Sequence, residues 1–142
     1  MSKSRRAAPS EHAEQCAVID WWAHACKSYG LPQFALIAIP NGAVLAGDAR
    51  RRAMQMHRLK AEGLRAGVPD LFLAKPIPYP GKLAAGCLIP GLWIEMKRKP
   101  NKPSTEQETV ILYLRQRSYH VVITWSADEA IKAIKAYLAW LP

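Results

Sequence analysis

The chain has 142 residues and a formal net charge of +9, with a sequence pI near 9.8. This length suits one compact domain, and the charge indicates a polyanionic partner, for which nucleic acid is the usual one. The three cysteines lack Cys-x-x-Cys spacing, which argues against a disulfide scaffold or a zinc ribbon and favours core packing in a reducing compartment. No apolar run approaches the roughly 20 residues of a membrane span.

The amino-terminal residues 1–9 are polar and basic, with no hydrophobic segment behind them. We interpret them as a short flexible arm and not as a secretory signal. The remainder, residues 10–142, is predicted to form a single domain, and an intracellular location is expected.

The first predicted element is a helix over residues 10–28, because Val18, Ile19, Trp22 and Cys26 recur at helical spacing. A short buried strand over residues 34–39 follows and ends in a turn at residues 40–42. Residues 47–62 predict a second helix, rich in arginine and lysine. Residues 70–74 predict a strand that follows the Gly-Val-Pro break at residues 67–69.

The second half of the chain begins with residues 75–90, which are rich in proline and glycine and predict a long hairpin loop. Residues 92–97 predict a strand and residues 99–103 a loop. Residues 104–117 predict a helix, with Ser104 and Gln107 in a capping-box pattern. A strand over residues 119–124 and a last helix from Ser126 complete the order.

This order of elements predicts an α/β fold, in which a small mixed β-sheet is flanked by helices. The second and third strands are joined by a hairpin and must be antiparallel. The helix between the third and fourth strands indicates a parallel crossover, which is expected to be right-handed.

Candidate chemistry centres on the third strand. Side chains alternate along a strand, so Glu95 and Lys97 project from the same face. Asp70 begins the preceding strand and can approach Glu95 if the two strands pair. Two close carboxylates favour a hard divalent cation such as Mg²⁺ between them, and Lys97 can then orient a water or stabilise charge on a phosphate. These groups suit metal-assisted phosphodiester hydrolysis.

The first helix offers further polar candidates. At about 100° per residue, Glu11 and Gln15 continue the apolar stripe of Val18 and Trp22, and Glu14 lies toward its flank. An inward carboxylate needs a partner, which a metal would provide. Alternatively, Glu11 lies in a frayed first turn and only favours the helix dipole.

Gln107 also has two interpretations. It precedes an apolar stripe at helical spacing, which points its side chain toward the core and the predicted site. A capping box explains a glutamine at this position without any role in catalysis.

Two basic stretches flank the predicted centre, and we interpret them as contacts to DNA phosphates, because few acids interleave with them. No histidine has metal-ligand spacing. The predicted DNA-binding residues are Arg50, Arg51, Arg52, Arg58 and Lys60 in the second helix, and Arg98, Lys99 and Lys102 after the third strand.

The motifs together resemble a known nuclease signature. Gly67-Val68-Pro69-Asp70 followed by Ile94-Glu95-Met96-Lys97 is similar to the signature of the PD-(D/E)xK superfamily. More narrowly, the chain resembles the VRR-NUC family in its stand-alone form from phages and prophages. The supporting motifs are Ser10-Glu11-His12 with Gln15, then Ile39-Pro40-Asn41-Gly42, and Ser104 with Gln107.

The resemblance implies a restriction-endonuclease-like core and Mg²⁺ or Mn²⁺ held by Asp70, Glu95 and the carbonyl of Met96. A helix-one glutamate completes the implied set, with Glu11 as the match and Glu14 as the alternative. Lys97 is the implied catalytic lysine and Gln107 a supporting residue.

The resemblance also implies a homodimeric, structure-selective DNA endonuclease in the cytoplasm of a bacterial host cell, with some relatives acting on four-way junctions. The connection over residues 75–90 is longer than the simplest members need, which leaves the substrate geometry open. The alternative function is a non-catalytic DNA- or junction-binding protein on the same fold.

Overall fold

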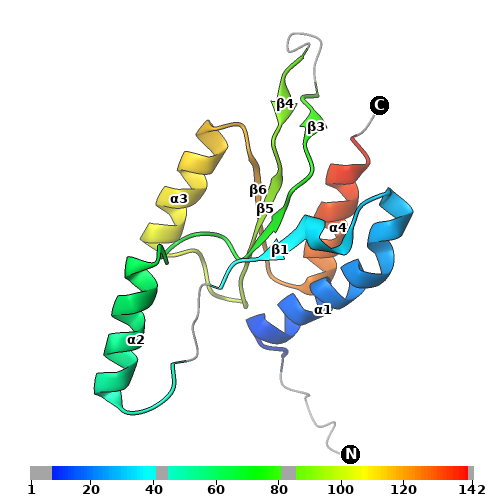
Figure 1. Ribbon diagram of the computed structural model, residues 1–142. Helices are drawn as coiled ribbons and strands as arrows, with labels where there is room; N and C mark the ends of the chain where they lie inside the picture. The colour runs from blue at the N-terminus through cyan, green and yellow to red at the C-terminus, as the bar shows by residue number, and fades with distance from the viewer. Residues whose placement is uncertain (1–7, 41–44, 81–85, 141–142) are drawn as a thin grey trace, which may run out of the picture.

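The computed structural model describes residues 8–40, 45–80 and 86–140 of the chain. Helices and strands follow one another in the order that the sequence predicts (Figure 1). The predicted arm lies outside the described residues except for Ala8 and Pro9. The elements are α1 (Glu11–Ala25), η1 (Cys26–Tyr29), η2 (Gln33–Ala35), β1 (Leu36–Ala38), α2 (Ala49–Ala61), β2 (Leu71–Leu73), β3 (Ile77–Pro78), β4 (Leu88–Ile89), β5 (Leu92–Met96), α3 (Thr105–Gln116), β6 (His120–Thr124) and α4 (Ala127–Leu138).

The main sheet has the strand order β1-β2-β5-β6. β2 pairs antiparallel with both β1 and β5, whereas β5 and β6 are parallel. The antiparallel hairpin and the parallel connection through α3 are therefore confirmed, as is the α/β class with a small mixed sheet. None of the described helices is long and apolar enough to span a membrane.

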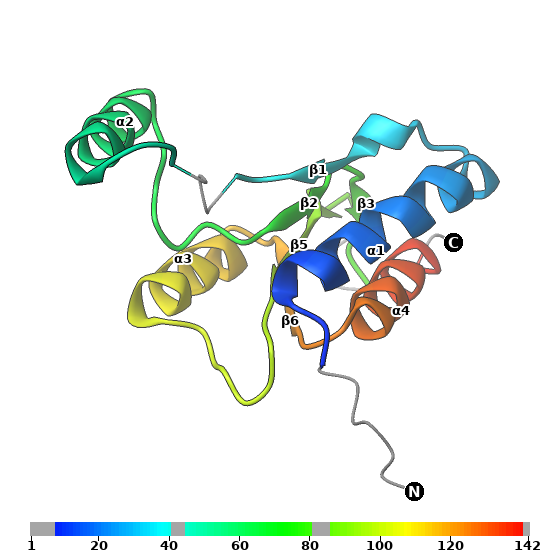
Figure 2. The same cartoon turned by 90° about the horizontal axis from the view of Figure 1, so that it is seen from below.

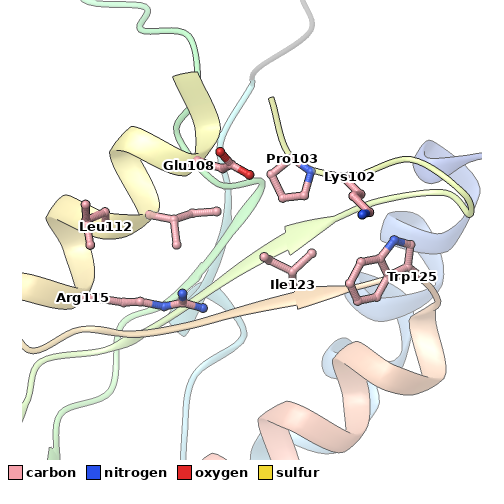
Figure 3. Close-up of a pocket in the computed structure, with 8 residues that line it drawn as sticks. Lys102, Pro103, Glu108, Leu112, Arg115, Ile123 and Trp125 are labelled. Atoms are coloured by element: carbon pink, nitrogen blue, oxygen red, sulfur yellow. The ribbon is translucent and has the colours of Figure 1, made fainter. Parts of the chain in front are cut away.

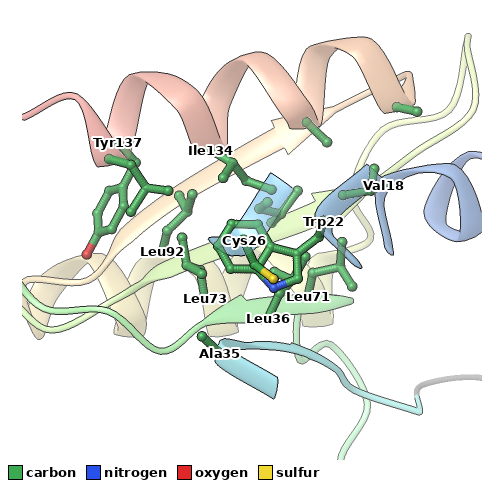
Figure 4. Close-up of a cluster of buried hydrophobic side chains, with 14 of the residues drawn as sticks. Val18, Trp22, Cys26, Ala35, Leu36, Leu71, Leu73, Leu92, Ile134 and Tyr137 are labelled. Atoms are coloured by element: carbon green, nitrogen blue, oxygen red, sulfur yellow. The ribbon is translucent and has the colours of Figure 1, made fainter. Parts of the chain in front are cut away.

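Helices cover both faces of this sheet (Figure 2). α1 and α4 pack together on one face, and α3 lies against the other. The core lies between the sheet and the α1–α4 pair, where Trp22, Leu92 and Ile134 are fully buried (Figure 4). The predicted stripe of the first helix supplies this core because Val18, Trp22 and Cys26 follow helical spacing.

Three predictions are wrong in detail. Part of the segment 75–90 is not loop, because β3 and β4 pair antiparallel and bury Ile77 and Ile89. The predicted strand over residues 34–39 begins as the 3₁₀ turn η2 and is extended only from Leu36. Of the cysteines, only Cys26 packs in the core, while Cys16 and Cys87 are exposed.

The basic helix α2 stands apart from the sheet (Figure 2). Its amino terminus is capped by Asp48, whose carboxylate accepts the Arg51 N–H at 2.9 Å. None of its described residues is buried. Its stability therefore depends on the cap and on helix propensity more than on packing.

The segment that precedes β2 lies against the first turn of α3 at Gly67. Gly67 has a φ of +87°, and a Cβ at this position would lie 2.6 Å from the carbonyl oxygen of Glu106. Only glycine meets both constraints without strain. This glycine therefore allows the chain to enter β2 beside the first turn of α3.

Replacing Gly67 by alanine should lower the free energy of unfolding by roughly 2–4 kcal/mol, because backbone strain adds to the clash with Glu106. Gly63 is the matched control, since its φ is +110° but no atom lies within 4 Å of the added Cβ. Gly63→Ala should cost roughly 1 kcal/mol. Urea unfolding of the two variants measures both values, and equal losses would refute the role given to the contact with Glu106.

Candidate functional site

Asp70 is held at the start of β2 by the pairing of β2 with β5. Leu71 is the Cα partner of Ile94, so the next residues along the two strands, Asp70 and Glu95, face each other. The Asp70 Oδ2 atom accepts a hydrogen bond from the backbone N–H of Met96 at 2.7 Å. The preceding Pro69 is buried and restricts the backbone at this entry. The predicted approach of the two carboxylates is therefore confirmed.

Glu95 is completely buried in β5. Its Oε1 atom accepts from the Gln107 amide at 2.6 Å and lies 2.8 Å from the Lys97 ammonium. Its Oε2 atom is buried and has no hydrogen-bond partner among the described residues. A buried carboxylate oxygen without a donor is costly in a folded protein.

The pKa of Glu95 reflects this environment. The pKa is raised to about 7, mainly by burial and also by the negative charges of Asp70 and Glu11, while Lys97 opposes the rise through its hydrogen bond and its charge. A positive charge near the free oxygen would therefore favour the ionised carboxylate.

Lys97 lies just beyond β5 with its side chain only 12% exposed. Its backbone N–H donates to the carbonyl of Thr124 at 2.8 Å, which extends the pairing with β6. The ammonium reaches back to Glu95, as the strand alternation predicts. The ion pair is largely withdrawn from solvent, so it is screened much less than a surface pair.

Gln107 closes the capping box and its side chain also reaches Glu95, while its role in the site stays a prediction. Its Oε1 atom accepts the Ser104 N–H at 2.9 Å, and its own N–H donates to the Ser104 hydroxyl at 3.3 Å. These two bonds form the capping box of α3. The amide nitrogen remains available and donates to Glu95.

The two candidate glutamates of α1 turn to different neighbours. Glu11 Oε1 accepts the backbone N–H of Arg98 at 2.9 Å, next to Lys97. Glu14 Oε2 accepts the N–H of Ala127 at 2.6 Å, at the amino terminus of α4. Glu14 therefore links α1 to α4. Glu11 links α1 to the end of β5, and its negative charge raises the pKa of Glu95.

A pocket of about 260 Å³ opens at Glu11 and Asp70, and we call it the carboxylate pocket. Glu95, Lys97 and Gln107 are not among its lining residues. Glu11, Asp70 and Met96 line it together with Gln15 from α1. His12, Ile39 and Pro40 also line the pocket, and among the sequence signals only the family resemblance pointed to them.

The oxygen atoms available to a metal come from few side chains. Within the described ranges, no group of three His, Cys, Asp or Glu side chains is arranged to hold a metal ion. The predicted set depends in part on a backbone carbonyl, that of Met96, and on the unpartnered Oε2 of Glu95. This set stays a prediction.

The predicted DNA-binding residues lie in two separate exposed groups. Arg50, Arg51, Arg52 and Lys60 are exposed on α2. Arg58 is exposed as well, but it pairs with Glu62 at 2.8 Å, so the expectation that acids do not neutralise this helix is wrong at this position. Arg98, Lys99 and Lys102 are exposed on the loop after β5.

Comparisons with known proteins bear on the fold. No family model matches the sequence, and no curated protein matches it significantly. A solved structure described as a "VRR_NUC domain protein" superposes with a TM-score of 0.72 and 22% sequence identity. The match covers 96% of this chain and 93% of the other. The chain therefore has the fold of a VRR_NUC domain protein, as the resemblance of its motifs implied.

Proposed function

We propose that the protein is a metal-dependent DNA endonuclease that hydrolyses phosphodiester bonds. The observation that carries the proposal is the state of Glu95. One of its oxygens is held by Lys97 and Gln107, and the other is buried without a partner among the described residues. Asp70 lies opposite Glu95 across the β2–β5 pairing. Stability alone does not favour such an arrangement, so a ligand for the second oxygen is expected.

A divalent cation suits this oxygen in chemical terms. Mg²⁺ and Mn²⁺ prefer carboxylate and carbonyl oxygens. Asp70, Glu95 and the carbonyl of Met96 would hold it, with Glu11 as the additional carboxylate at the carboxylate pocket. When bound, the cation would act as a Lewis acid on the phosphodiester.

The protein's own groups complete the proposed chemistry. Lys97 places a positive charge beside Glu95, where it would stabilise negative charge on the scissile phosphate or orient the attacking water. Gln107 holds the Glu95 carboxylate in one orientation through its amide N–H. Glu11 holds the backbone at Arg98 and so helps to place Lys97.

DNA is the proposed substrate, supported by the net charge of +9 and by the exposed basic residues of α2 and of the loop after β5. We propose branched DNA, such as a four-way junction, because the stand-alone family that the motifs resemble includes such enzymes. A homodimer would make paired incisions simple, and the exposed Phe34 and Ile37 near the free edge of β1 offer it a surface. Light scattering measures the molar mass in solution and so tests whether the protein is a dimer.

A non-catalytic DNA-binding protein on the same fold is the second candidate. The basic surface alone would suffice for it. It gives no reason for a buried Glu95 paired with Lys97, which is why the endonuclease is preferred. Tight DNA binding without turnover, unaffected by a chelator, would favour this candidate.

Incubation with four-way junction, flap, splayed-arm, nicked and linear DNA should give cleavage in Mg²⁺ or Mn²⁺ and none in EDTA. Lys97→Ala should lower the cleavage rate roughly a hundredfold or more, because it removes a charge from the reacting centre. Lys132→Ala is the matched control, since Lys132 is an exposed lysine on α4 outside the proposed DNA-binding residues. Cleavage that survives Lys97→Ala unchanged would contradict the assigned role.

In EDTA, Glu95→Gln should stabilise the protein at pH 8 by roughly 1–3 kcal/mol and change little at pH 4.5. The Glu95 pKa is raised to about 7 in the folded protein from 4.5. Folding therefore favours the protonated carboxyl, and the wild type loses that contribution as the pH rises through 7. The glutamine stays neutral throughout. Urea unfolding of both proteins across this pH range measures the effect. A difference in stability between Glu95→Gln and the wild type that does not change with pH would contradict the prediction.

Added Mn²⁺ supplies a separate comparison of the two α1 glutamates. Glu11→Gln should weaken the stabilisation by Mn²⁺ in thermal unfolding, because Glu11 lines the carboxylate pocket. Glu14→Gln should instead lower the stability by roughly 1 kcal/mol with and without Mn²⁺, because Glu14 supports the start of α4. The reverse pattern would make Glu14 the helix-one ligand.

A further inference from the structure

A second pocket lies on the α3 side of the sheet, and the proposed reaction does not use it. We call it the α3 pocket; its volume is about 350 Å³, within the range of small-molecule sites. Its apolar lining, which we call its floor, includes Ile111 and Leu112 of α3 and Ile123 of β6. Figure 3 shows the pocket between α3 and β6. The indole of Trp125 forms one wall.

This pocket lies directly beside the strand that carries Glu95. Ile123 is the Cα partner of Glu95 in the parallel pairing of β5 with β6. Neighbouring strands lie about 4.8 Å apart, and paired residues project from the same face. Glu108 of the pocket follows Gln107, which contacts Glu95. A ligand in the α3 pocket would therefore be adjacent to the proposed reacting centre.

Two cations and one carboxylate surround the apolar floor (Figure 3). Lys102 belongs to the basic loop after β5. Arg115 donates one N–H to the carbonyl of Val121 at 3.0 Å, which anchors the guanidinium while other donors of the fork remain. Glu108 is exposed and supplies hydrogen-bond acceptors. Trp125 donates its indole N–H to the carbonyl of Asn101 at 2.9 Å, which ties the loop to this wall.

We propose that the α3 pocket binds one unstacked nucleotide of the DNA substrate, next to the cleavage site. The aromatic and apolar surface suits a nucleobase, and Lys102 and Arg115 suit its phosphates. Glu108 would accept a hydrogen bond from an exocyclic amino group, as carboxylates accept from cytosine. The pocket therefore favours cytosine over thymine. This inference rests on DNA being the substrate.

Charge complementarity selects this occupant over a second copy of the chain. Every copy carries a net charge of +9, so the cations of the α3 pocket favour a polyanion. An unstacked nucleotide supplies an apolar face and a negative charge together. Branched DNA offers unpaired nucleotides at its branch point, close to the bond to be cut.

The test measures binding of labelled six-nucleotide single strands of dC or dT to the full chain in EDTA, by fluorescence anisotropy. Leu112→Glu places an acid in the pocket, and Tyr113→Glu makes the same charge change next to it. These side chains are 59% and 56% exposed, so both variants should fold. Leu112→Glu should weaken dC binding roughly tenfold more than Tyr113→Glu. Equal losses would overturn the proposal.

Base preference gives an independent readout. The wild type should bind dC more tightly than dT, and Glu108→Gln should reduce that ratio. Glu106→Gln is the control, since Glu106 is exposed on the same helix and does not line the pocket. An unchanged ratio in Glu108→Gln would overturn the role of the carboxylate. If Leu112→Glu alters only the oligomeric state in light scattering, the pocket is a protein contact and the proposal is wrong.

The experiment separates this inference from the proposed function, because binding in EDTA requires no turnover. Pocket-dependent binding without cleavage in any metal would refute the endonuclease and leave the nucleotide site standing. Cleavage that is equally fast in Leu112→Glu and Tyr113→Glu, together with equal binding, would refute the nucleotide site and leave the endonuclease standing.

Discussion

The antiparallel pairing of β2 with β5 is the constraint on which the rest of the site depends. It sets Asp70 opposite Glu95, although the two residues are far apart in the chain. Just before the paired residues of β2, the carboxylate of Asp70 accepts the backbone N–H of Met96. One side chain thereby completes the sheet and brings a negative charge to the carboxylate pocket. The contact of Gly67 with α3 fixes the entry to this pairing from the other side.

The burial of Glu95 is the energetic cost of this arrangement. Lys97 and Gln107 compensate one of its oxygens, and the other remains without a partner among the described residues. The raised pKa is the direct consequence of that incomplete compensation. Folded proteins tolerate such local instability where a ligand or a reaction needs it, and the large apolar core between α1, α4 and the sheet supplies the stability that the site lacks.

The sheet separates two kinds of environment. Its α1–α4 face carries the apolar core, with the carboxylate pocket at the first turns of α1. Glu95 and Gln107 meet on the α3 face, where both the ion pair and the α3 pocket lie. The TM-score of 0.72 at 22% identity shows a shared fold with few identical residues. A core requires only apolar residues of suitable size at the right spacing, so a fold can persist while most residue identities change.

The sequence by itself determined the order of the elements, the shared face of Glu95 and Lys97, and the capping box of α3, because each follows from local periodicity or from residues within one helical turn. Only the tertiary structure decided between Glu11 and Glu14 as neighbours of β5. Both lie in the first turns of α1, and their distant contacts with Arg98 and Ala127 separate them. Local patterns likewise could not predict the hydrogen bond from Gln107 to Glu95 or the pairing of β3 with β4. Periodicity reports which face of an element is buried, whereas the partner on that face is set by long-range packing.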